Sequence, residues 1–149
     1  MAIILIDTEG TLFDNTHRLD LFRSSQWEEY EDACIEDTVI EPTAKFIRTM
    51  VHDTFWRTLL VTPRYERFRE RTTDILVREK LYIDGGYFRP TLDKMPKVKE
   101  PLLKLQYVEQ IREKFPGEEL YALEDRDDCV DAYRNAGVTC WQVAPGVIG

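Results

Sequence analysis

Short runs of β-branched and aliphatic residues alternate along this chain with segments whose apolar residues recur every three or four positions. The short runs predict strands near residues 3–6, 58–61, 120–123 and 138–143. The periodic segments predict helices near residues 26–35, 43–51, 65–78, 101–114 and 127–135. A strand followed by a helix, repeated along a chain, is typical of a parallel sheet with right-handed crossovers. We therefore expect an α/β, Rossmann-like fold with helices on both faces of the sheet.

The connection after the first predicted strand is unusually long. Residues 14–40 exceed the few residues that usually join a strand to a helix. We expect this segment to form a small flap with a short helix over the edge of the sheet. Neither this connection nor the one after Arg64 is long enough for a large cap domain. The sequence therefore predicts a single domain over residues 1–149 with a minimal cap or none.

The composition limits the class of protein. A chain of 149 residues with 43% hydrophobic content can bury a sizeable core. No apolar run approaches the roughly 18 residues that span a bilayer, and the first residues lack the basic region of a secretory signal. Cys34, Cys129 and Cys140 show no CxxC spacing, so we expect reduced thiols in a cytoplasmic protein. The formal charge of −8 disfavours indiscriminate adhesion to nucleic acid or anionic membranes, although a locally basic site is compatible with it.

The first predicted strand ends in an acidic turn. Asp7 follows the apolar run, Glu9 comes two residues later, and Gly10 permits the positive φ that a tight turn needs. The carboxyl edge of a parallel sheet is where open α/β folds build their sites. Since an unpaired buried carboxylate is costly, we expect a metal ion or a cationic partner nearby. The alternative is an ordinary solvated turn built from Asp and Gly.

A second predicted strand also ends in acids, at Glu124 and Asp125. If the two strands are neighbours, Asp7, Glu9, Glu124 and Asp125 meet at one edge, where like charges repel strongly. A hard divalent cation with oxygen ligands, such as Mg²⁺, relieves that repulsion. The alternative is that Glu124 and Asp125 only stabilise the start of the following helix through its dipole.

Two further places carry polar groups that suit a phosphate. Thr62 and Arg64 follow the strand predicted near 58–61, where a hydroxyl donor and a guanidinium can bind a phosphoryl oxygen. Lys97 and Lys99 lie at the start of the helix predicted over 101–114, where a lysine opposes the helix dipole unless an anion or acids compensate. The alternatives are a Thr-Pro turn with a solvated arginine, and ordinary surface lysines.

Together these residues resemble the haloacid dehalogenase superfamily of phosphotransferases. Its four motifs occur in the correct order across almost the whole chain: Asp7-Thr8-Glu9-Gly10-Thr11, then Thr62, then a lysine best matched by Lys99, with Lys97 and Lys104 as other registers, then Glu124-Asp125. Further details resemble the small phage-type phosphatases related to the polynucleotide kinase 3′-phosphatase domain. These are Asp14-x-x-His17-Arg18-Leu19, Trp27 with Cys34, Val61-Thr62-Pro63-Arg64, Asp125-Arg126 with Tyr133-Arg134-x-x-Gly137, and the ending Cys140-Trp141-Gln142-Val143-Ala144-Pro145-Gly146.

The resemblance implies a mechanism centred on Asp7. Asp7 would attack phosphorus and form an aspartyl-phosphate that water then hydrolyses. The metal ligands would be Asp7, Asp125 and the backbone carbonyl of Glu9, with Mg²⁺ as the cofactor. The Glu9 side chain would protonate the leaving oxygen and later activate water.

The same resemblance assigns the remaining motif residues. Thr62 and Lys99 would bind the phosphoryl oxygens, and Glu124 would orient Lys99 or metal-bound water. Arg64, placed near the substrate by its position after Thr62, completes the expected substrate-binding residues. Three residues depart from the usual pattern: Glu9 replaces Asp, Pro63 stands where Gly is common, and Glu124 replaces Asp. The longer Glu9 matters because a displacement of about 1 Å can cost on the order of 10²-fold in rate.

The absence of a large cap in the pattern favours an accessible phosphate over an enclosed metabolite. The leading substrate is a polynucleotide 3′-phosphate, followed by a nucleotide monophosphate. Another reading is a catalytically weakened domain that binds a phosphorylated ligand or partner protein. Arginines available for a basic rim, unless they pair with nearby acids, are Arg18, Arg23, Arg64, Arg67, Arg69 and Arg71. Aromatics available for stacking, unless they pack in the core, are Trp27, Tyr65 and Phe68.

Overall fold

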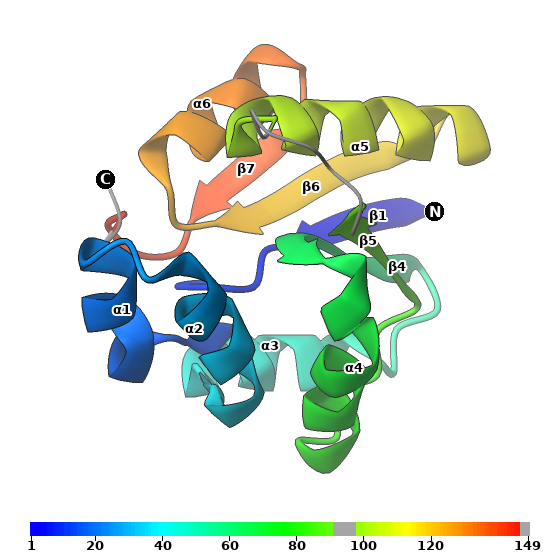
Figure 1. Ribbon diagram of the computed structural model, residues 1–149. Coiled ribbons are helices and arrows are strands. Elements are labelled where there is room, and N and C mark those ends of the chain that lie inside the picture. Colours follow the sequence, from blue (N-terminus) through cyan, green and yellow to red (C-terminus); the bar gives the residue numbers. More distant parts are fainter. Residues whose placement is uncertain (91–97, 147–149) are drawn as a thin grey trace.

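The computed structural model describes residues 1–90 and 98–146. Its main sheet consists of β1 (Ala2–Ile6), β4 (Trp56–Tyr65), β5 (Gly85–Arg89), β6 (Glu119–Glu124) and β7 (Thr139–Gln142). All five strands are parallel, in the order β5-β4-β1-β6-β7 (Figure 1). The central strand β1 is buried along its whole length, as expected of a parallel strand covered on both faces. The predicted α/β, Rossmann-like architecture is confirmed.

Helices cover both faces of the sheet. α3 (Glu41–Met50) and α4 (Arg69–Arg78) lie on one face, and α5 (Glu100–Lys114) and α6 (Asp127–Asn135) lie on the other (Figure 1). Because successive side chains of a strand point to opposite faces, Ile3 and Leu5 of β1 pack with α5 and α6. Ile4 and Ile6 pack with α3 and α4 on the opposite face. Each fully buried aliphatic side chain stabilises the fold by roughly 1.5–3 kcal/mol, so β1 anchors both layers.

Residues 13–39, called the flap below, rise from the end of the first motif. The flap contains β2 (Phe13–Asp14), the 3₁₀ turn η1 (Thr16–Arg18), α1 (Leu19–Arg23), α2 (Trp27–Asp32), the 3₁₀ turn η2 (Ala33–Glu36) and β3 (Thr38–Val39). β2 and β3 pair antiparallel and close its base. α2 has no buried residue, so the flap is held mainly from below. It falls in the segment for which the sequence predicts a flap; that the chain is a single domain stays a prediction.

The edge strand β5 is not predicted from the sequence pattern. Gly85 and Gly86 lower the strand propensity of this segment, which explains the omission. In the structure a Cβ at Gly86 would lie 2.9 Å from Phe88, and Arg69 donates a hydrogen bond to the Gly86 carbonyl oxygen at 3.1 Å. Glycine at position 86 therefore leaves room for the side chains of Phe88 and Arg69, which come close to this edge strand.

β4 is longer than predicted. It passes the predicted end at residue 61 and continues to Tyr65, with a break in its register with β5 between Val61 and Tyr65. Pro63 lies at this irregularity, where its missing N–H does not interrupt a regular ladder. A 3₁₀ turn, η3 (Glu66–Phe68), follows, so α4 begins at Arg69 and not at residue 65. The longer strand includes Arg64, whose side chain contacts Glu9 and Asp37.

Within the described residues, no helix combines the length and the apolar character needed to cross a membrane. Cys34, Cys129 and Cys140 are buried and form no disulfide, as the sequence predicts. A cytoplasmic location stays a prediction.

Candidate active site

Two acidic turns meet at the carboxyl edge of the sheet. Asp7 directly follows β1, and Asp125 directly follows β6, its neighbour in the sheet. The register aligns Ile6 with Leu123 and so places the two turns side by side. One carboxylate oxygen from each of Asp7, Glu124 and Asp125 lies within 4.8 Å of the other two. The predicted meeting of the two turns is present in the structure.

Gly10 and Thr11 fit the first turn closely against Asp125. Thr11 Oγ1 lies 3.2 Å from Asp7 Oδ2 and 3.2 Å from Asp125 Oδ1, so its proton can serve either carboxylate. Gly10 has a φ of +80°, and a Cβ at this position would lie 2.3 Å from Asp125 Oδ2. Only glycine combines this backbone conformation with room for the carboxylate.

Lys104 is the lysine that joins the acids. Its ammonium group is fully buried and lies 2.6 Å from Asp7 Oδ1 and 3.2 Å from Glu124 Oε2. It also donates a hydrogen bond to the Val61 carbonyl oxygen at 2.8 Å. Lys99, the preferred register in the sequence, is the exposed residue that precedes α5, so the geometry favours the alternative register at Lys104. Lys97 lies outside the described residues.

The carboxylates carry more negative charge than Lys104 offsets. Burial, followed by the charge of Glu124, raises the pKa of Asp7 to about 7, although Lys104 acts in the opposite direction. Burial and the neighbouring Asp7 raise the pKa of Asp125 to about 7 as well. A cation among these oxygens stabilises the ionised carboxylates. The oxygen donors of Asp7, Glu124 and Asp125 fit a hard divalent cation.

The Glu9 side chain points to arginines and is not part of this carboxylate cluster. Its Oε1 accepts hydrogen bonds from Arg64 Nε at 2.5 Å and from Arg18 Nη2 at 3.0 Å, and its Oε2 accepts one from Thr8. Burial alone would raise its pKa, but the charges of Arg64 and Arg18 hold the pKa of Glu9 at about 2. Glu9 is therefore an ionised carboxylate in this conformation. The predicted contact of its backbone carbonyl with a metal stays a prediction.

Asp37 fixes the two arginines from the base of the flap. It is completely buried and accepts hydrogen bonds from Arg18 Nε at 2.8 Å and from Arg64 Nη2 at 2.6 Å. Arg64 also donates to Thr72 of α4 at 3.0 Å. Arg64, which the sequence assigns to the substrate, thus links β4, α4 and the flap through buried partners. Two buried carboxylates balance two buried guanidiniums in this network.

Thr62 lies next to Thr8, the residue between Asp7 and Glu9. Its side chain is buried, and its Oγ1 lies 2.8 Å from Thr8 Oγ1 and accepts the Arg64 backbone N–H at 3.0 Å. The following Pro63 offers no N–H, and its carbonyl oxygen accepts a hydrogen bond from Arg89 at 3.3 Å. The strand end therefore presents one hydroxyl group, without the additional backbone donor that glycine at position 63 would supply.

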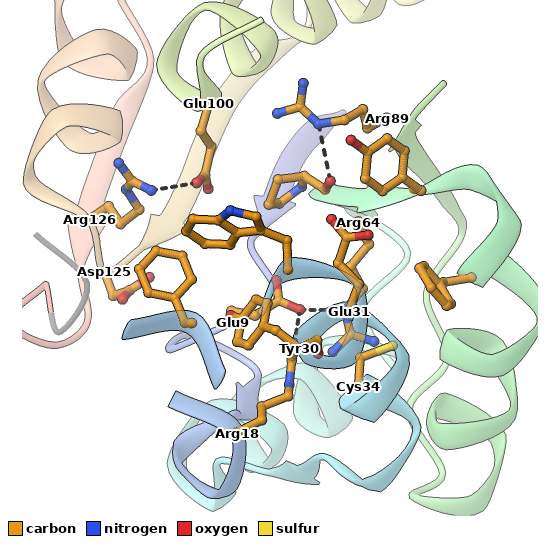
Figure 2. Close-up of a pocket in the computed structure, with 15 residues that line it drawn as sticks. Glu9, Arg18, Tyr30, Glu31, Cys34, Arg64, Arg89, Glu100, Asp125 and Arg126 are labelled. Atoms are coloured by element: carbon orange, nitrogen blue, oxygen red, sulfur yellow. Dashed lines mark hydrogen bonds and ion pairs between the residues drawn. The ribbon is translucent and has the colours of Figure 1, made fainter. Parts of the chain in front are cut away.

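A cavity of about 220 Å³ lies between the flap and the strand ends. Arg18, Tyr30 and Arg64 gather near Glu9, Asp125 lies beside Arg126 on one side of the cavity, and Arg89 lies on the other side (Figure 2). Its other lining residues, mostly aromatic and apolar from the flap and the segment after β4, are Phe22, Trp27, Glu31, Cys34, Pro63, Tyr65, Phe68 and Glu100. The cavity therefore combines the acids of the site with aromatic and cationic walls.

Residues 1–147 match the sequence family described as the polynucleotide kinase PNKP phosphatase domain. The chain belongs to this family. It is a phosphatase of the haloacid dehalogenase type, and the resemblance seen in its motifs is confirmed. The comparison with curated protein sequences gives no match.

Solved structures with the same fold include larger proteins. A chain of the Pnkp1/Rnl/Hen1 RNA repair complex shares 21% identity over 99% of this phosphatase, with a TM-score of 0.73. This phosphatase spans only 43% of that chain. A hydrolase from Streptococcus pneumoniae TIGR4 shares 16% identity over 97% of this phosphatase and 94% of its own chain, with a TM-score of 0.63.

A third structure with this fold was determined with ligands. The D,D-heptose 1,7-bisphosphate phosphatase from B. bronchiseptica, complexed with magnesium and phosphate, shares 18% identity, with a TM-score of 0.59. The match covers 95% of this phosphatase and 79% of that chain. At such identities these likenesses establish the fold of this phosphatase and no more.

Sequence reasoning ranked Lys104 below Lys99, named Arg18 only in a flap motif and a basic rim, and assigned no role to Asp37. Lys104 occupies the buried stripe of α5 with Leu103, Tyr107 and Val108, and a lysine among apolar residues at helical spacing is the signal that identifies it. Arg18 contacts Glu9 only because the flap folds back over the strand ends. Asp37 likewise meets its partners across the flap, and no local pattern marks it.

Proposed function

We propose that this phosphatase hydrolyses phosphomonoesters with Asp7 as the nucleophile, through an aspartyl-phosphate intermediate, and with Mg²⁺ as the cofactor. The observation that carries the proposal is the joint position of Asp7, Asp125 and Lys104 at adjacent strand ends. Asp7 is buried, lies beside a fixed ammonium group and has a carboxylate oxygen within 4.8 Å of one from Asp125, which lines the cavity. Such an arrangement suits a carboxylate that must attack an anionic phosphate.

The metal would be held by Asp7 and Asp125, with the Glu9 backbone carbonyl as the third protein ligand. The raised pKa values of Asp7 and Asp125 support a cation at this position, because both reflect burial and the repulsion between carboxylates whose combined charge Lys104 offsets only in part. When bound, the ion would neutralise the carboxylates and polarise the phosphoryl oxygens. The magnesium and phosphate in the B. bronchiseptica enzyme are consistent with this choice.

The chain's own residues would carry the two displacements. In the first, an Asp7 oxygen forms a bond to phosphorus while the bond to the ester oxygen breaks, and the departing oxygen takes a proton to become an alcohol. In the second, water attacks phosphorus, the bond to Asp7 breaks, and inorganic phosphate leaves with the carboxylate restored. Lys104 would keep Asp7 ionised and oriented, and Thr62 would donate a hydrogen bond to a phosphoryl oxygen.

Glu9 would serve as the proton carrier. As an ionised carboxylate it is ready to accept a proton from the attacking water in the second displacement. To protonate the leaving oxygen in the first displacement, it must first gain a proton, which Arg64 and Arg18 oppose. The proposal therefore implies that substrate binding loosens the contacts between Glu9 and these arginines. If these contacts persist, esters with good leaving groups, which need little acid assistance, should be hydrolysed faster than other esters.

The substrate we propose is a 3′-phosphate at the end of a polynucleotide, with a nucleotide monophosphate second. Membership of the family described as the PNKP phosphatase domain supports this choice, as does the likeness to a chain from an RNA repair complex. The cavity is bordered by a small flap, which leaves it open enough for the end of a longer molecule. Because this chain spans less than half of that neighbour, partners found there are not carried over.

A second candidate is a catalytically weakened domain that binds a phosphorylated ligand or partner protein. Two observations favour it: the Glu9 carboxylate is held by two arginines, and Pro63 removes a backbone donor from the strand end. In this case Thr62 and Lys104 would still bind a phosphate, but turnover would be negligible.

Phosphate release from a generic aryl phosphate and from 3′-phosphorylated oligonucleotides separates the two candidates. We expect turnover that requires Mg²⁺, stops with a chelator and is lost in Asp7→Asn. Phosphopeptides and 5′-phosphorylated oligonucleotides serve as comparison substrates. Tight binding of a 3′-phosphorylated oligonucleotide, with no Asp7-dependent release of phosphate from any substrate, would support the binding candidate instead.

A further inference from the structure

Trp27 is an exposed aromatic residue that lines the cavity of the active site. It is the first residue of α2 in the flap, and 48% of its surface is exposed. It shares the cavity with Glu9 and Asp125 at the strand ends. The other two aromatic residues considered for stacking are 8% and 4% exposed, namely Tyr65 and Phe68, and both pack against Cys34. Trp27 is therefore the one of these three with surface available for a ligand.

The flap holds the Trp27 ring in a defined place. Phe22 of α1 contacts it in an edge-to-face arrangement, with ring centroids 4.9 Å apart and an angle of 83° between the planes. Phe22 also contacts Tyr30 at 5.3 Å, and the Tyr30 hydroxyl accepts a hydrogen bond from Asn15 at 3.1 Å. The edge-to-face contacts thus connect Trp27 through Phe22 and Tyr30 to Asn15, near the start of the flap. A ring that is fixed before binding loses little conformational freedom when a ligand stacks on it.

Most of the arginines considered for a basic rim are paired with acids in the structure. The protein carries a formal charge of −8, and Arg18 and Arg64 are paired with the buried Glu9 and Asp37. Further arginines of the predicted basic rim pair with acids, in the pairs Arg23–Asp20, Arg67–Glu31 and Arg69–Glu66. Since phosphate contacts supply most of the affinity of typical nucleic acid binders, this pairing increases the share of the affinity that aromatic contacts must supply.

We infer that Trp27 stacks on the base of the nucleotide whose phosphate is hydrolysed, and so makes the enzyme selective for phosphates that carry a base. The inference rests on the proposed function and adds the residue that recognises the substrate. Three observations support it. Trp27 shares its cavity with Glu9 and Asp125, its ring is both fixed and exposed, and most of the rim arginines are paired with acids. Stacking on an aromatic side chain tolerates any base, because every base has a π-face.

The test compares two substrates in the full chain with Mg²⁺ present. One is a dinucleotide with a 3′-phosphate, and the other is the same molecule without the base on its 3′-terminal sugar. We expect Trp27→Ala to raise KM for the first by roughly 5- to 150-fold, the range for losing one base-aromatic stack, with kcat nearly unchanged. The KM of the second substrate, already high in the parent, should not change. Trp27→Phe should recover most of the parental KM.

Trp141→Ala is the matched control. Trp141 belongs to β7, is 47% exposed and lies outside this cavity, so its loss should leave both KM values unchanged. Equal effects of Trp27→Ala on the KM of the two substrates, or no effect on either KM, would overturn the inference. The proposed function would stand in that case, provided that turnover still depends on Asp7. A KM in Trp27→Phe as high as in Trp27→Ala would also overturn the inference. If the parent releases phosphate from neither substrate in an Asp7-dependent manner, the proposed function and the inference both fail.

Discussion

The ammonium group of Lys104 lies 2.6 Å from Oδ1 of Asp7, and both side chains are buried. The same ammonium group reaches Glu124 at 3.2 Å and the carbonyl oxygen of Val61 at 2.8 Å. It thereby connects the ends of β1, β4 and β6 from the helix that covers them. A lysine at this point compensates part of the negative charge that the two acidic turns bring together.

Replacing Lys104 should therefore damage the site, whereas replacing Lys99 should not. In Lys104→Met, Asp7 and Glu124 lose their buried counter-charge, which should lower the free energy of unfolding by about 3–5 kcal/mol. Phosphatase activity should fall on the order of 10²- to 10³-fold, as for other fixed groups that stabilise charge in a transition state. Lys99→Met changes an exposed side chain and should alter stability by no more than about 0.5 kcal/mol. Urea unfolding and initial rates would measure both; a larger loss of activity in Lys99→Met contradicts the assignment.

Glu9→Gln should separate the two displacements of the proposed mechanism. The amide keeps the length of the side chain but cannot take a proton from water, so hydrolysis of the aspartyl-phosphate should slow by roughly 10²-fold or more. An aryl phosphate with a good leaving group needs little acid assistance, so its first displacement should be less affected.

Rapid mixing would then reveal a burst of phenolate followed by a slow steady state. A uniform slowing of both phases in Glu9→Gln would argue against Glu9 as the base that activates water. Glu9→Asp extends the test, since the shorter side chain cannot reach both Arg18 and Arg64 from the same backbone position. A large gain in rate in Glu9→Asp would mean that the natural glutamate restrains turnover.

Gly10→Ala and Gly117→Ala form a matched pair. Their φ angles are +80° and +79°, so both replacements introduce a similar backbone strain of about 1–2 kcal/mol. A Cβ at Gly10 would lie 2.3 Å from Asp125 Oδ2, whereas a Cβ at Gly117 meets no atom within 4 Å. Gly10→Ala should therefore be less stable than Gly117→Ala by a further 1–3 kcal/mol or so, and it alone should lose Mg²⁺ binding. Equal melting temperatures and equal Mg²⁺ affinity in the two variants would contradict this packing.

Stabilisation by Mg²⁺ should increase with pH. Burial and the charge of Glu124 raise the pKa of Asp7, and burial and the charge of Asp7 raise that of Asp125, each from 3.8 to about 7. At a pH between 3.8 and about 7, Asp7 and Asp125 of the folded, metal-free protein hold protons that the same residues of the unfolded chain have released. The stability that the folded protein gains from this source is present at low pH and is lost as the pH rises through 7.

A divalent cation replaces those protons, so the rise in Tm that Mg²⁺ produces should be small near about pH 5 and large near about pH 8. Glu9 acts with the opposite sign, because Arg64 and Arg18 hold its pKa, despite burial, at about 2. The stability it contributes is present above its ordinary value of 4.5 and is lost below it, outside the window of the Mg²⁺ effect. Thermal scans with Mg²⁺ and with a chelator at each pH would measure this dependence, and a Tm shift that does not vary with pH would contradict it.

The strand ends of the site follow from the sequence because each acid directly follows an apolar run. Asp7 and Asp125 meet since parallel neighbouring strands deliver their ends to the same edge, a rule that needs no side-chain detail. The register of Lys104 was ranked below that of Lys99 because a motif was matched by its place near a helix start, while the buried stripe of α5 carries the information. β5 was missed because Gly85 and Gly86 conceal a strand that pairs with β4.

The contacts of Glu9 lie beyond what a sequence pattern can express. They depend on how residues 13–39 fold over the strand ends, which brings Arg18 and Asp37 to Arg64. A search for local motifs treats Glu9 as a longer aspartate and does not anticipate that two guanidiniums bind it.

The most direct measurement is mass spectrometry of the protein after rapid quenching during turnover of an aryl phosphate with Mg²⁺. The mechanism predicts one added phosphoryl group on the peptide that contains Asp7, absent from Asp7→Asn and absent when a chelator replaces Mg²⁺. Sustained, Mg²⁺-dependent phosphate release by Asp7→Asn, with no phosphoryl group on that peptide in the parent, would contradict it.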